Sequence, residues 1–491
     1  MKKTHILFLF LTMMFSTAFA VTPSKNQKTP DDSSFVRVSK IDPRYFELSN
    51  GTPYIPVGPN ICFPRLIIDE KLGFESIEMM YKNSAKYGAN YTRIYLASEF
   101  FEIENEKQGV FNESQIKRVD KVLELAKKYH LRVKFTFEQF RFLKDTIKRF
   151  PGHASFQKPV YHIDNGGSFS NVNEYFNTEK GKEVYMKRVS FIVNRYKNNP
   201  NVFGWELWNE FDAVEISGKN QSLIDWTKDI LTRVHALDNN HLVMQNLGSL
   251  DRDAAIPLYK SIDTIQNNDV ATVHRYIDLG ARFKVCHGPM DILTSDAVKE
   301  VYKFKLNKPI LLAETGAVEP NHAAPSKLYL KDTAGIILHD LLFAPFFAGS
   351  AGSGQSWHWK EYLQQNNLWY QFGRFNAAIA GVNPLVENFQ PSEFLIPKCR
   401  AYAISGNKTT LIWCRDAESN WQTELVENKK PGEIDSSIPL SKLGLKAKNI
   451  KSVQVYDPWK NKWFKAKVVE NSVKLPIFTR SIMLKIVKKS A

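Results

Sequence analysis

Short apolar segments alternate with amphipathic helical patterns between residues 54 and 360, and this alternation restricts the possible folds more than any other feature. In the helical pattern of residues 113–130, one face carries Ile116, Val119, Val122, Leu123 and Ala126. The predicted strands are residues 54–60, 90–96, 131–138, 202–210, 241–246, 270–276 and 308–314, with a weaker candidate near 346–359. Eight strands, each followed by a helix, predict an α/β fold of the (β/α)8 or TIM-barrel type. A doubly wound sheet is less favoured, because no G-x-G-x-x-G motif follows the first strand.

Two segments extend the predicted barrel. Residues 35–58 resemble a hairpin that turns at Ser49-Asn50-Gly51 and leads into the first strand. Residues 141–178 are too long for a plain connection between a strand and its helix, and they are rich in aromatic residues and glycine. Long loops of this kind usually shape a binding surface.

The pattern changes to short strands after Asn388-Phe389-Gln390-Pro391, which predicts a small all-β sandwich over residues 389–491. The catalytic domain is then expected to span 35–388. Cys399 and Cys414 flank a turn at Gly406-Asn407, and equal counting from that turn places them opposite each other. A disulfide bridge and two packed free thiols are the alternatives for this pair. Neither Cys62 nor Cys286 has metal-ligand spacing around it.

The first twenty residues have the form of a secretory signal peptide. Lys2 and Lys3 precede an apolar stretch that ends in Ala18-Phe19-Ala20, an A-x-A cleavage site. We therefore expect export to the periplasm or the exterior, with residues 21–34 as a disordered lead-in. No later apolar run is long enough to predict a membrane span.

The formal net charge of +15 raises the question of a polyanionic partner. Much of the excess lies in residues 391–491, which hold 19 Lys and Arg against 9 Asp and Glu. An exported protein meets little nucleic acid, so a nucleic-acid partner is not predicted. A solvated surface and contact with an acidic glycan or envelope surface are the two explanations left open. The sandwich is correspondingly either a binding module or a domain that packs against the barrel.

Polar and aromatic side chains gather at the carboxyl ends of the predicted strands, where α/β barrels place their active sites. They are Asn60, Arg93, Glu138, Asn209, Glu210, Asn246, His274, Tyr276, Glu314 and Trp357. An inert barrel would end its strands on small capping residues instead. This set predicts a catalytic face.

Glu210 and Glu314 end the fourth and seventh strands, across the barrel from each other, and paired carboxylates suit glycoside hydrolysis. Their side chains can approach the separation of about 5–5.5 Å that a retaining mechanism needs. His274 and Tyr276 share one side of the sixth strand and can hydrogen-bond towards the two glutamates. Arg93 can keep a carboxylate nucleophile ionised.

Asn209 is placed to hold a sugar hydroxyl. Asn60 and Glu138 are further candidate substrate contacts at strand ends. Trp357 is expected to be a sugar platform, while Trp359 is either a second platform or part of the core.

These motifs resemble glycoside hydrolase clan A, and within it family 5, the cellulase and mannanase group. The resemblance covers about residues 40–385 and rests on Trp208-Asn209-Glu210, Glu314 in LLAETG, His274-x-Tyr276 and Arg93, in the correct order. It implies that Glu210 is the acid/base, Glu314 the nucleophile and Trp357 the platform at the cleavage point. One departure is Glu138, where many members of the family have a histidine.

The chain is therefore expected to be an exported retaining glycosidase that acts on a β-mannan or β-glucan, without a metal or an organic cofactor. An exo-acting β-glycosidase, a β-1,3-glucanase and a non-catalytic glycan-binding protein are the alternatives. Linkage, endo or exo action and oligomeric state are left open by the residue types.

Overall fold

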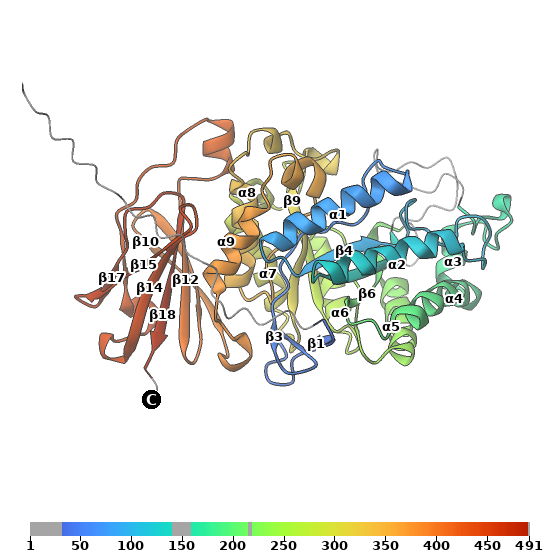
Figure 1. The fold of residues 1–491 in the computed structure, drawn as a ribbon, viewed down its shortest axis with the longest axis horizontal. Helices are drawn as coiled ribbons and strands as arrows, with labels where there is room; N and C mark the ends of the chain where they lie inside the picture. Colours follow the sequence, from blue (N-terminus) through green and yellow to red (C-terminus); the bar gives the residue numbers. More distant parts are fainter. Residues whose placement is uncertain (1–31, 140–158, 215–218, 490–491) are drawn as a thin grey trace, which may run out of the picture. The chain divides into compact units, whose positions relative to one another are not determined.

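The computed structural model of the chain describes residues 32–139, 159–214 and 219–489. The predicted signal peptide, most of the lead-in and residues 141–158 of the long loop lie outside this part. Figure 1 shows a region of strands surrounded by helices, followed along the chain by the antiparallel strands of the carboxyl-terminal region.

Six regular strands of the barrel are parallel. Strands β4 (Tyr91–Tyr95), β5 (Arg132–Gln139), β6 (Val202–Asn209) and β7 (Leu242–Met244) pair in that order, and β8 (Ala271–Ile277) pairs with β9 (Ile310–Ala317). Helix α1 (Glu70–Lys86) precedes β4. The helices between and after the six strands are α2 (Glu113–Lys128), α3 (Val172–Asn177), α4 (Glu179–Tyr196), α5 (Lys219–Leu237), α6 (Ile256–Asp263), α7 (Met290–Tyr302), α8 (Ile336–Phe347) and α9 (Tyr370–Ile379). This alternation confirms the (β/α)8 barrel, and the apolar face expected for 113–130 is the buried face of α2.

The predicted first and eighth strands occupy the right places but are not regular strands. The backbone N–H of Asn60 donates to the carbonyl of Ser356 over 3.0 Å, which joins the two segments. On the outer sides, the N–H of Tyr95 donates to Cys62 over 3.0 Å and that of Thr315 donates to Gln355 over 3.1 Å. These bonds continue the ring of strands from β9 round to β4.

Proline and close packing explain the irregular backbone of the first segment. Pro56 and Pro59 have no N–H to donate to a neighbouring strand. Gly58 lies so close to β4 that a Cβ there would be 2.0 Å from the carbonyl oxygen of Tyr91. The first segment therefore forms a few backbone hydrogen bonds with its neighbours instead of the regular hydrogen-bond ladder of a β-strand.

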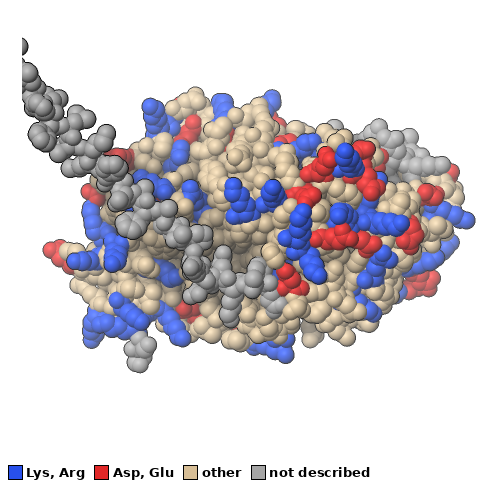
Figure 2. Space-filling view, in the orientation of Figure 1, with Lys and Arg blue, Asp and Glu red and all other residues tan. Residues whose placement is uncertain are grey.

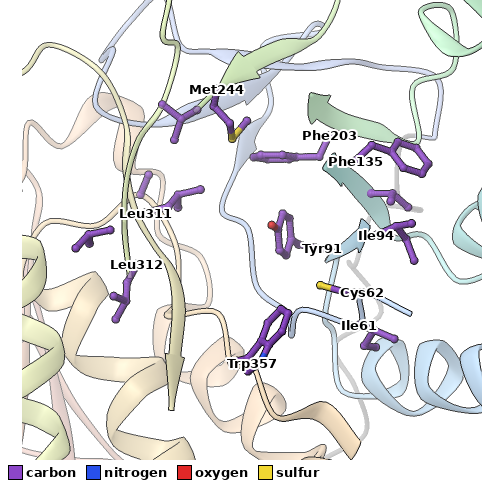
Figure 3. Close-up of a cluster of buried hydrophobic side chains, with 14 of the residues drawn as sticks. Ile61, Cys62, Tyr91, Ile94, Phe135, Phe203, Met244, Leu311, Leu312 and Trp357 are labelled. Atoms are coloured by element: carbon purple, nitrogen blue, oxygen red, sulfur yellow. The ribbon is translucent and has the colours of Figure 1, made fainter. Parts of the chain in front are cut away.

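Apolar and aromatic side chains pack against one another inside part of the barrel. Figure 3 shows Tyr91 between Phe203 and Cys62, with Met244 beyond Phe203 and Trp357 beyond Cys62. The ring of Phe203 contacts Tyr91 edge to face, with centroids 5.2 Å apart. This packing closes the barrel beneath its carboxyl-terminal face, so that only the strand ends and their loops are available for chemistry.

The predicted amino-terminal hairpin is present as β2 (Phe46–Leu48) and β3 (Pro53–Tyr54), and β1 (Val36–Val38) adds a third strand to it. In the turn, Gly51 has φ of 85°, a conformation that favours glycine. Phe46 contacts Phe203 edge to face at 5.5 Å, which ties the hairpin to the barrel interior.

The carboxyl-terminal region contains two antiparallel sheets. The larger has the order β10 (Gln390–Ile396), β11 (Cys399–Ser405), β12 (Thr409–Asp416), β18 (Ser481–Lys488), β14 (Ile450–Asp457) and β15 (Lys462–Lys465). The smaller consists of β13 (Ser437–Pro439), β17 (Ser472–Lys474) and β16 (Val468–Val469). The predicted all-β character is confirmed, while the boundary at residue 389 stays a prediction.

Both faces of the larger sheet are buried. Trp413 and Met483 belong to the core that is continuous with the barrel, whereas Ile412 and Leu484, on the opposite face, belong to a second core with the small sheet. Successive residues of a strand point to opposite faces, so this alternation means that the sheet is covered on both sides.

Buried ion pairs join the larger sheet to helices α7 and α8. Arg400 Nε and the hydroxyl of Tyr402 each donate to Asp291 Oδ2 over 2.7 Å. Arg415 Nε donates to Asp340 Oδ1 over 2.7 Å, and both of these side chains are buried. Of the two roles expected for this region, packing against the barrel is the one that these contacts favour.

The expected position of the cysteine pair is wrong by two residues. The register pairs Cys399 with Asp416 and Ala401 with Cys414. Ser405 pairs with Thr410, so four residues rather than two lie between the last paired positions of the two strands. Both thiols are buried and free.

On one face of the molecule, basic side chains are spread out rather than gathered in one stripe. On the face that Figure 2 shows, Lys and Arg are interspersed with Asp and Glu. This distribution agrees with a solvated surface. Within the described parts of the chain, no helix is both long and apolar enough to cross a bilayer.

Candidate active site

Glu210 and Glu314 face each other at the carboxyl-terminal end of the barrel. Glu210 follows β6 directly, and Glu314 lies within β9, three residues before its end. One carboxylate oxygen of each glutamate lies within 4.8 Å of the other. The side chain of Glu314 is 3% exposed and that of Glu210 is 17% exposed. The structure therefore brings the predicted pair together, with Glu210 as the more accessible of the two.

The backbone at Glu210 adopts a left-handed conformation, with φ of 46°. A non-glycine residue in this region is strained, and such strain persists only where the surroundings hold it. Here the side chain of Asn246 accepts a hydrogen bond from the N–H of Glu210 over 2.6 Å. This contact gives the predicted strand-end residue Asn246 a positioning role.

Three donors hold the carboxylate of Glu314. Arg93 Nη1 and the hydroxyl of Tyr95 both donate to Oε1, the latter over 2.9 Å, while the hydroxyl of Tyr276 donates to Oε2 over 2.7 Å. Burial raises the pKa of Glu314, but the charges of His274 and Arg93 and the bond from Tyr276 outweigh it, and the net shift is downward. Glu314 is therefore kept ionised.

The pKa of Glu210 moves in the opposite direction. Burial raises it, and the negative charge of Glu314 adds to this, while the hydrogen bond with His274 acts against both. His274 Nδ1 lies 3.1 Å from Glu210 Oε1 and 3.6 Å from Glu314 Oε2. Two neighbouring carboxyl groups with opposite shifts can serve as an acid and as a nucleophile.

Arg93 connects Glu314 to a second buried carboxylate, that of Glu206. Its guanidinium donates to Glu206 as well as to Glu314, and Nη2 also donates to Asn209 Oδ1 over 2.8 Å. Thr136 accepts from Arg93 Nε over 3.0 Å and donates to Glu206 Oε1 over 2.7 Å. Asn209 is thus held by Arg93.

Glu206 and Lys134 form a buried ion pair beneath Arg93. Lys134 Nζ lies 2.6 Å from Glu206 Oε2, and neither side chain is exposed. Burial raises the pKa of Glu206, but Arg93 and Lys134 lower it to about 2 overall. Burial and the charge of Arg93 lower the pKa of Lys134 to about 8.

The sequence alone did not identify Tyr95, Lys134, Thr136 or Glu206 as part of the site. A signal was present: polar groups stand at alternate positions of otherwise apolar strands, as in YTRIY and RVKFT. In a barrel these positions share the inward side, so their side chains meet.

Other predicted contacts are placed differently. Trp357 is 8% exposed and lies against Tyr95, with ring centroids 5.6 Å apart, so it remains a candidate platform. Trp359 is fully buried against Phe63 and Trp357, and it belongs to the core. Asn60 is also fully buried, and its amide donates to the carbonyl of Ala313 over 2.8 Å. For Trp359 the structure favours the core of the two alternatives, and a substrate contact from Asn60 stays a prediction.

Glu138 is fully buried and lies 3.6 Å from Arg188, whose guanidinium also binds Glu102. This ion-pair cluster joins the end of β5, helix α4 and the segment that follows β4. A sugar contact from Glu138 stays a prediction.

Glu210, His274 and Glu314 also bring three potential metal-ligand atoms within 4.8 Å of one another. The positive guanidinium of Arg93 already binds Glu314, and it would oppose a cation there. The group is therefore better suited to acid/base and nucleophilic chemistry than to metal binding.

The chain from residue 68 to residue 336 matches the family model described as Cellulase (glycosyl hydrolase family 5). The chain belongs to glycosyl hydrolase family 5. Mannan endo-1,4-beta-mannosidase 5 of Solanum lycopersicum is 26% identical over 336 residues, which cover 63% of this chain and 77% of that protein. Mannan endo-1,4-beta-mannosidase 7 of Arabidopsis thaliana is 23% identical over 295 residues, 54% of this chain and 65% of that protein.

Solved structures support the fold of this family 5 enzyme. A structure described as a glycoside hydrolase superposes with a TM-score of 0.58 at 15% identity and covers 94% of this chain and 99% of its own. A family 5 glycoside hydrolase from Bacteroides vulgatus gives a TM-score of 0.56 at 13% identity, with 94% of each chain covered. The resemblance inferred from the motifs is confirmed, and the protein is a retaining β-glycoside hydrolase.

Proposed function

We propose that this enzyme is an exported endo-acting β-1,4-mannanase, with Glu210 as the acid/base and Glu314 as the nucleophile. The observation that carries the catalytic assignment is the opposite direction of the two pKa shifts in carboxyl groups within 4.8 Å of each other. A protonated Glu210 beside an ionised Glu314 is the starting state of a double displacement.

In the first step, the carboxylate of Glu314 attacks the anomeric carbon while Glu210 gives its proton to the glycosidic oxygen. The bond between the anomeric carbon and that oxygen breaks, and the leaving sugar departs with the proton. Glu210 is then a carboxylate next to a neutral ester, so its pKa falls and it can act as a base.

In the second step, Glu210 takes a proton from water, and the water oxygen attacks the anomeric carbon. The ester bond to Glu314 breaks, and the configuration of the substrate is retained. Arg93, Tyr95 and Tyr276 stabilise the carboxylate that is released, because all three donate to it in the free enzyme.

Support for a mannan substrate comes from the names of the relatives above, which are mannan endo-1,4-β-mannosidases. Trp357, near the nucleophile's partner Tyr95, is our candidate platform for the sugar at the cleavage point.

Incubation with a panel of β-1,4-mannan, β-1,4-glucan, β-1,3-glucan and xylan, followed by sizing of the products, tests the substrate. A range of manno-oligosaccharides early in the reaction is expected. Release of single sugars from the start would contradict endo action, and turnover confined to another polymer would contradict the mannan assignment.

Glu314→Gly tests the catalytic roles. This variant should lose hydrolysis, yet use an α-mannosyl fluoride as a donor, because the fluoride mimics the configuration of the glycosyl-enzyme. Glu470→Gly, at an exposed position in the turn between β16 and β17, is the control and should hydrolyse normally. Near-normal turnover by Glu314→Gly would overturn the assignment.

Export rests on the amino-terminal sequence alone. Expression of the full chain in a secreting host, with sequencing of the mature amino terminus, tests it. A mature protein that begins at Val21 is expected, and retention in the cytoplasm with Met1 in place would contradict export.

A further inference from the structure

Ser249, His322 and Asp278 form a hydrogen-bonded chain that the mechanism above does not use. Ser249 follows β7, Asp278 follows β8 and His322 follows β9, so three separate connections contribute to it. Ser249 Oγ lies 3.2 Å from His322 Nε2, and His322 Nδ1 lies 2.8 Å from Asp278 Oδ2.

The imidazole of His322 is held in a fixed orientation. Oδ1 of Asp278 accepts the backbone N–H groups of Gly280 and Asn321, each over 2.8 Å. Asn321 and His322 both have left-handed backbones, with φ of 62° and 58°. The strained backbone of Asn321 and His322 therefore orients the imidazole ring towards Ser249.

Contacts on both sides of Ser249 place this chain beside Glu210. The N–H of Gly248 donates over 2.6 Å to Asp212, two residues after Glu210. The N–H of Leu250 donates over 2.9 Å to the carbonyl of His274, the residue whose ring contacts Glu210.

His322 also packs against the machinery of the nucleophile. Its ring meets Tyr276 edge to face, with centroids 5.1 Å apart, and the hydroxyl of Tyr276 binds Glu314. Its side chain is 31% exposed, whereas that of Asp278 is 3% exposed. Ser249 is partly exposed as well. In this hydrogen-bonded group, the hydroxyl of Ser249 and the imidazole of His322 are therefore partly exposed to solvent, whereas the carboxylate of Asp278 is buried.

A leaving-group sugar has to lie against Glu210, because that residue protonates the oxygen between the two sugars. Partly exposed hydrogen-bonding groups beside Glu210 are therefore placed to meet it. Resting on the function proposed above, we propose that Ser249 and His322 form a binding subsite for hydroxyl groups of the leaving-group sugar, positioned by Asp278.

The charge of the imidazole supports this role. Burial lowers the pKa of His322, whereas the hydrogen bond with Asp278 and the negative charge of that carboxylate raise it; Glu210 adds to the increase when it is ionised, and the net shift is upward. A protonated ring donates from Nε2 to Ser249 Oγ, which frees the serine hydrogen for a sugar oxygen.

The same three residue types occur in acyl-transfer enzymes, but the surroundings differ. Stabilisation of an oxyanion requires backbone N–H groups aimed at the reacting oxygen. The N–H groups of Gly248 and Leu250, which flank the serine, are already bound to Asp212 and His274. Binding of a sugar hydroxyl needs no such pair.

Two substrates that differ only in the leaving group test the subsite. Wild type, Ser249→Ala and His322→Gln are compared on a β-1,4-manno-oligosaccharide and on an aryl β-mannobioside, whose leaving group is a phenol. The ratio of kcat/KM for the oligosaccharide to that for the aryl glycoside should fall about tenfold in each variant, the effect of one lost hydrogen bond. The control is His235→Gln. The imidazole of His235 lies on α5 and pairs with Asp269, and this variant should keep the wild-type ratio.

A second readout does not depend on how much of a variant is folded. With mannobiose added as an acceptor, the glycosyl-enzyme partitions between transfer to the sugar and hydrolysis. Both variants should lower the transfer-to-hydrolysis ratio, because the acceptor binds where the leaving group was.

An equal loss on both substrates, or an unchanged partition ratio, would overturn the subsite while leaving the catalytic assignment intact. Covalent labelling of Ser249 by a fluorophosphonate would also overturn it, in favour of acyl transfer. A wild-type protein that is inactive on both substrates but active on another glycan would contradict the mannan assignment, and the same ratios measured with that glycan then decide the subsite.

Discussion

The hydroxyl of Tyr276 donates to Oε2 of Glu314 over 2.7 Å, and this bond links the sixth strand of the barrel to the seventh. Burial and the charges of Glu314 and Glu210 raise the pKa of Tyr276 well above its ordinary value, so the phenol remains a donor. Tyr276 thus holds one carboxylate oxygen of Glu314, while Arg93 and Tyr95 hold the other.

Tyr276→Phe should lower kcat/KM by about 10- to 100-fold, which is the value of one hydrogen bond to a charged group. The bond lowers the pKa of Glu314, so its loss should move the acidic limb of the pH profile to higher pH. Measurement of kcat/KM between pH 3 and pH 8 tests both effects. Tyr370→Phe, which loses a bond to the carbonyl of Ala334, is the control. An unmoved acidic limb would contradict the role of Tyr276.

Glu210→Gln should abolish the alkaline limb of the pH profile on an activated aryl glycoside. Activity in the wild type falls as pH rises through the raised pKa of Glu210, because the acid is then lost. An activated aryl glycoside needs little acid assistance in the first step. The variant should therefore lose less of its turnover on this substrate than on a manno-oligosaccharide. Added azide should restore turnover by attacking the glycosyl-enzyme without a base. A variant that retains the wild-type alkaline limb would exclude Glu210 as the acid.

Glu206→Gln should weaken the dependence of stability on acid pH. The pKa of Glu206 is about 2 in the folded protein and about 4.5 when it is exposed, so its contribution is complete above pH 4.5 and disappears as pH falls towards 2. This difference corresponds to roughly 3 kcal/mol. Urea unfolding at several pH values should show a variant that is less stable at pH 7 and loses less on acidification. Equal slopes for variant and wild type would refute this account.

Arg415→Met should reduce the free energy of unfolding by about 3–5 kcal/mol, because Asp340 would be left buried without its partner. Arg195→Met removes a solvent-exposed ion pair with Asp120 and should cost less than about 1 kcal/mol. Thermal unfolding of the two variants gives the comparison. Similar losses in both would mean that the carboxyl-terminal sheet contributes little to the barrel.

Deletion of residues 389–491 is a broader test of the same interface. The deletion would expose the face of α8, which is buried along its whole length, and leave Asp291 and Asp340 unpaired. An insoluble product is expected. A folded enzyme with weaker binding to polymeric substrate would instead support a binding module.

The sequence was sufficient for the barrel and for the two glutamates because both depend on order along the chain. Strands that alternate with helices can pack in few ways, and the carboxyl ends of parallel strands meet at one face. The sequence alone therefore predicts that Glu210 and Glu314 lie close together.

Other features depend on distances between residues far apart in sequence. The way neighbouring strands fit against one another brings Arg93, Glu206 and Lys134 together inside the barrel. The same fit buries Asn60 and Trp359. The position of Cys399 relative to Cys414 depends on two extra residues between the paired positions of their strands. The hydrogen bonds that link Ser249, His322 and Asp278 join three connections that no local sequence pattern relates.

The sequence by itself thus determined the architecture and the pair of carboxyl groups. Only the tertiary structure decided how burial and neighbouring charges move the pKa of Glu210 up and that of Glu314 down. The reason is physical: periodicity is a property of neighbouring residues, whereas desolvation and charge act through space.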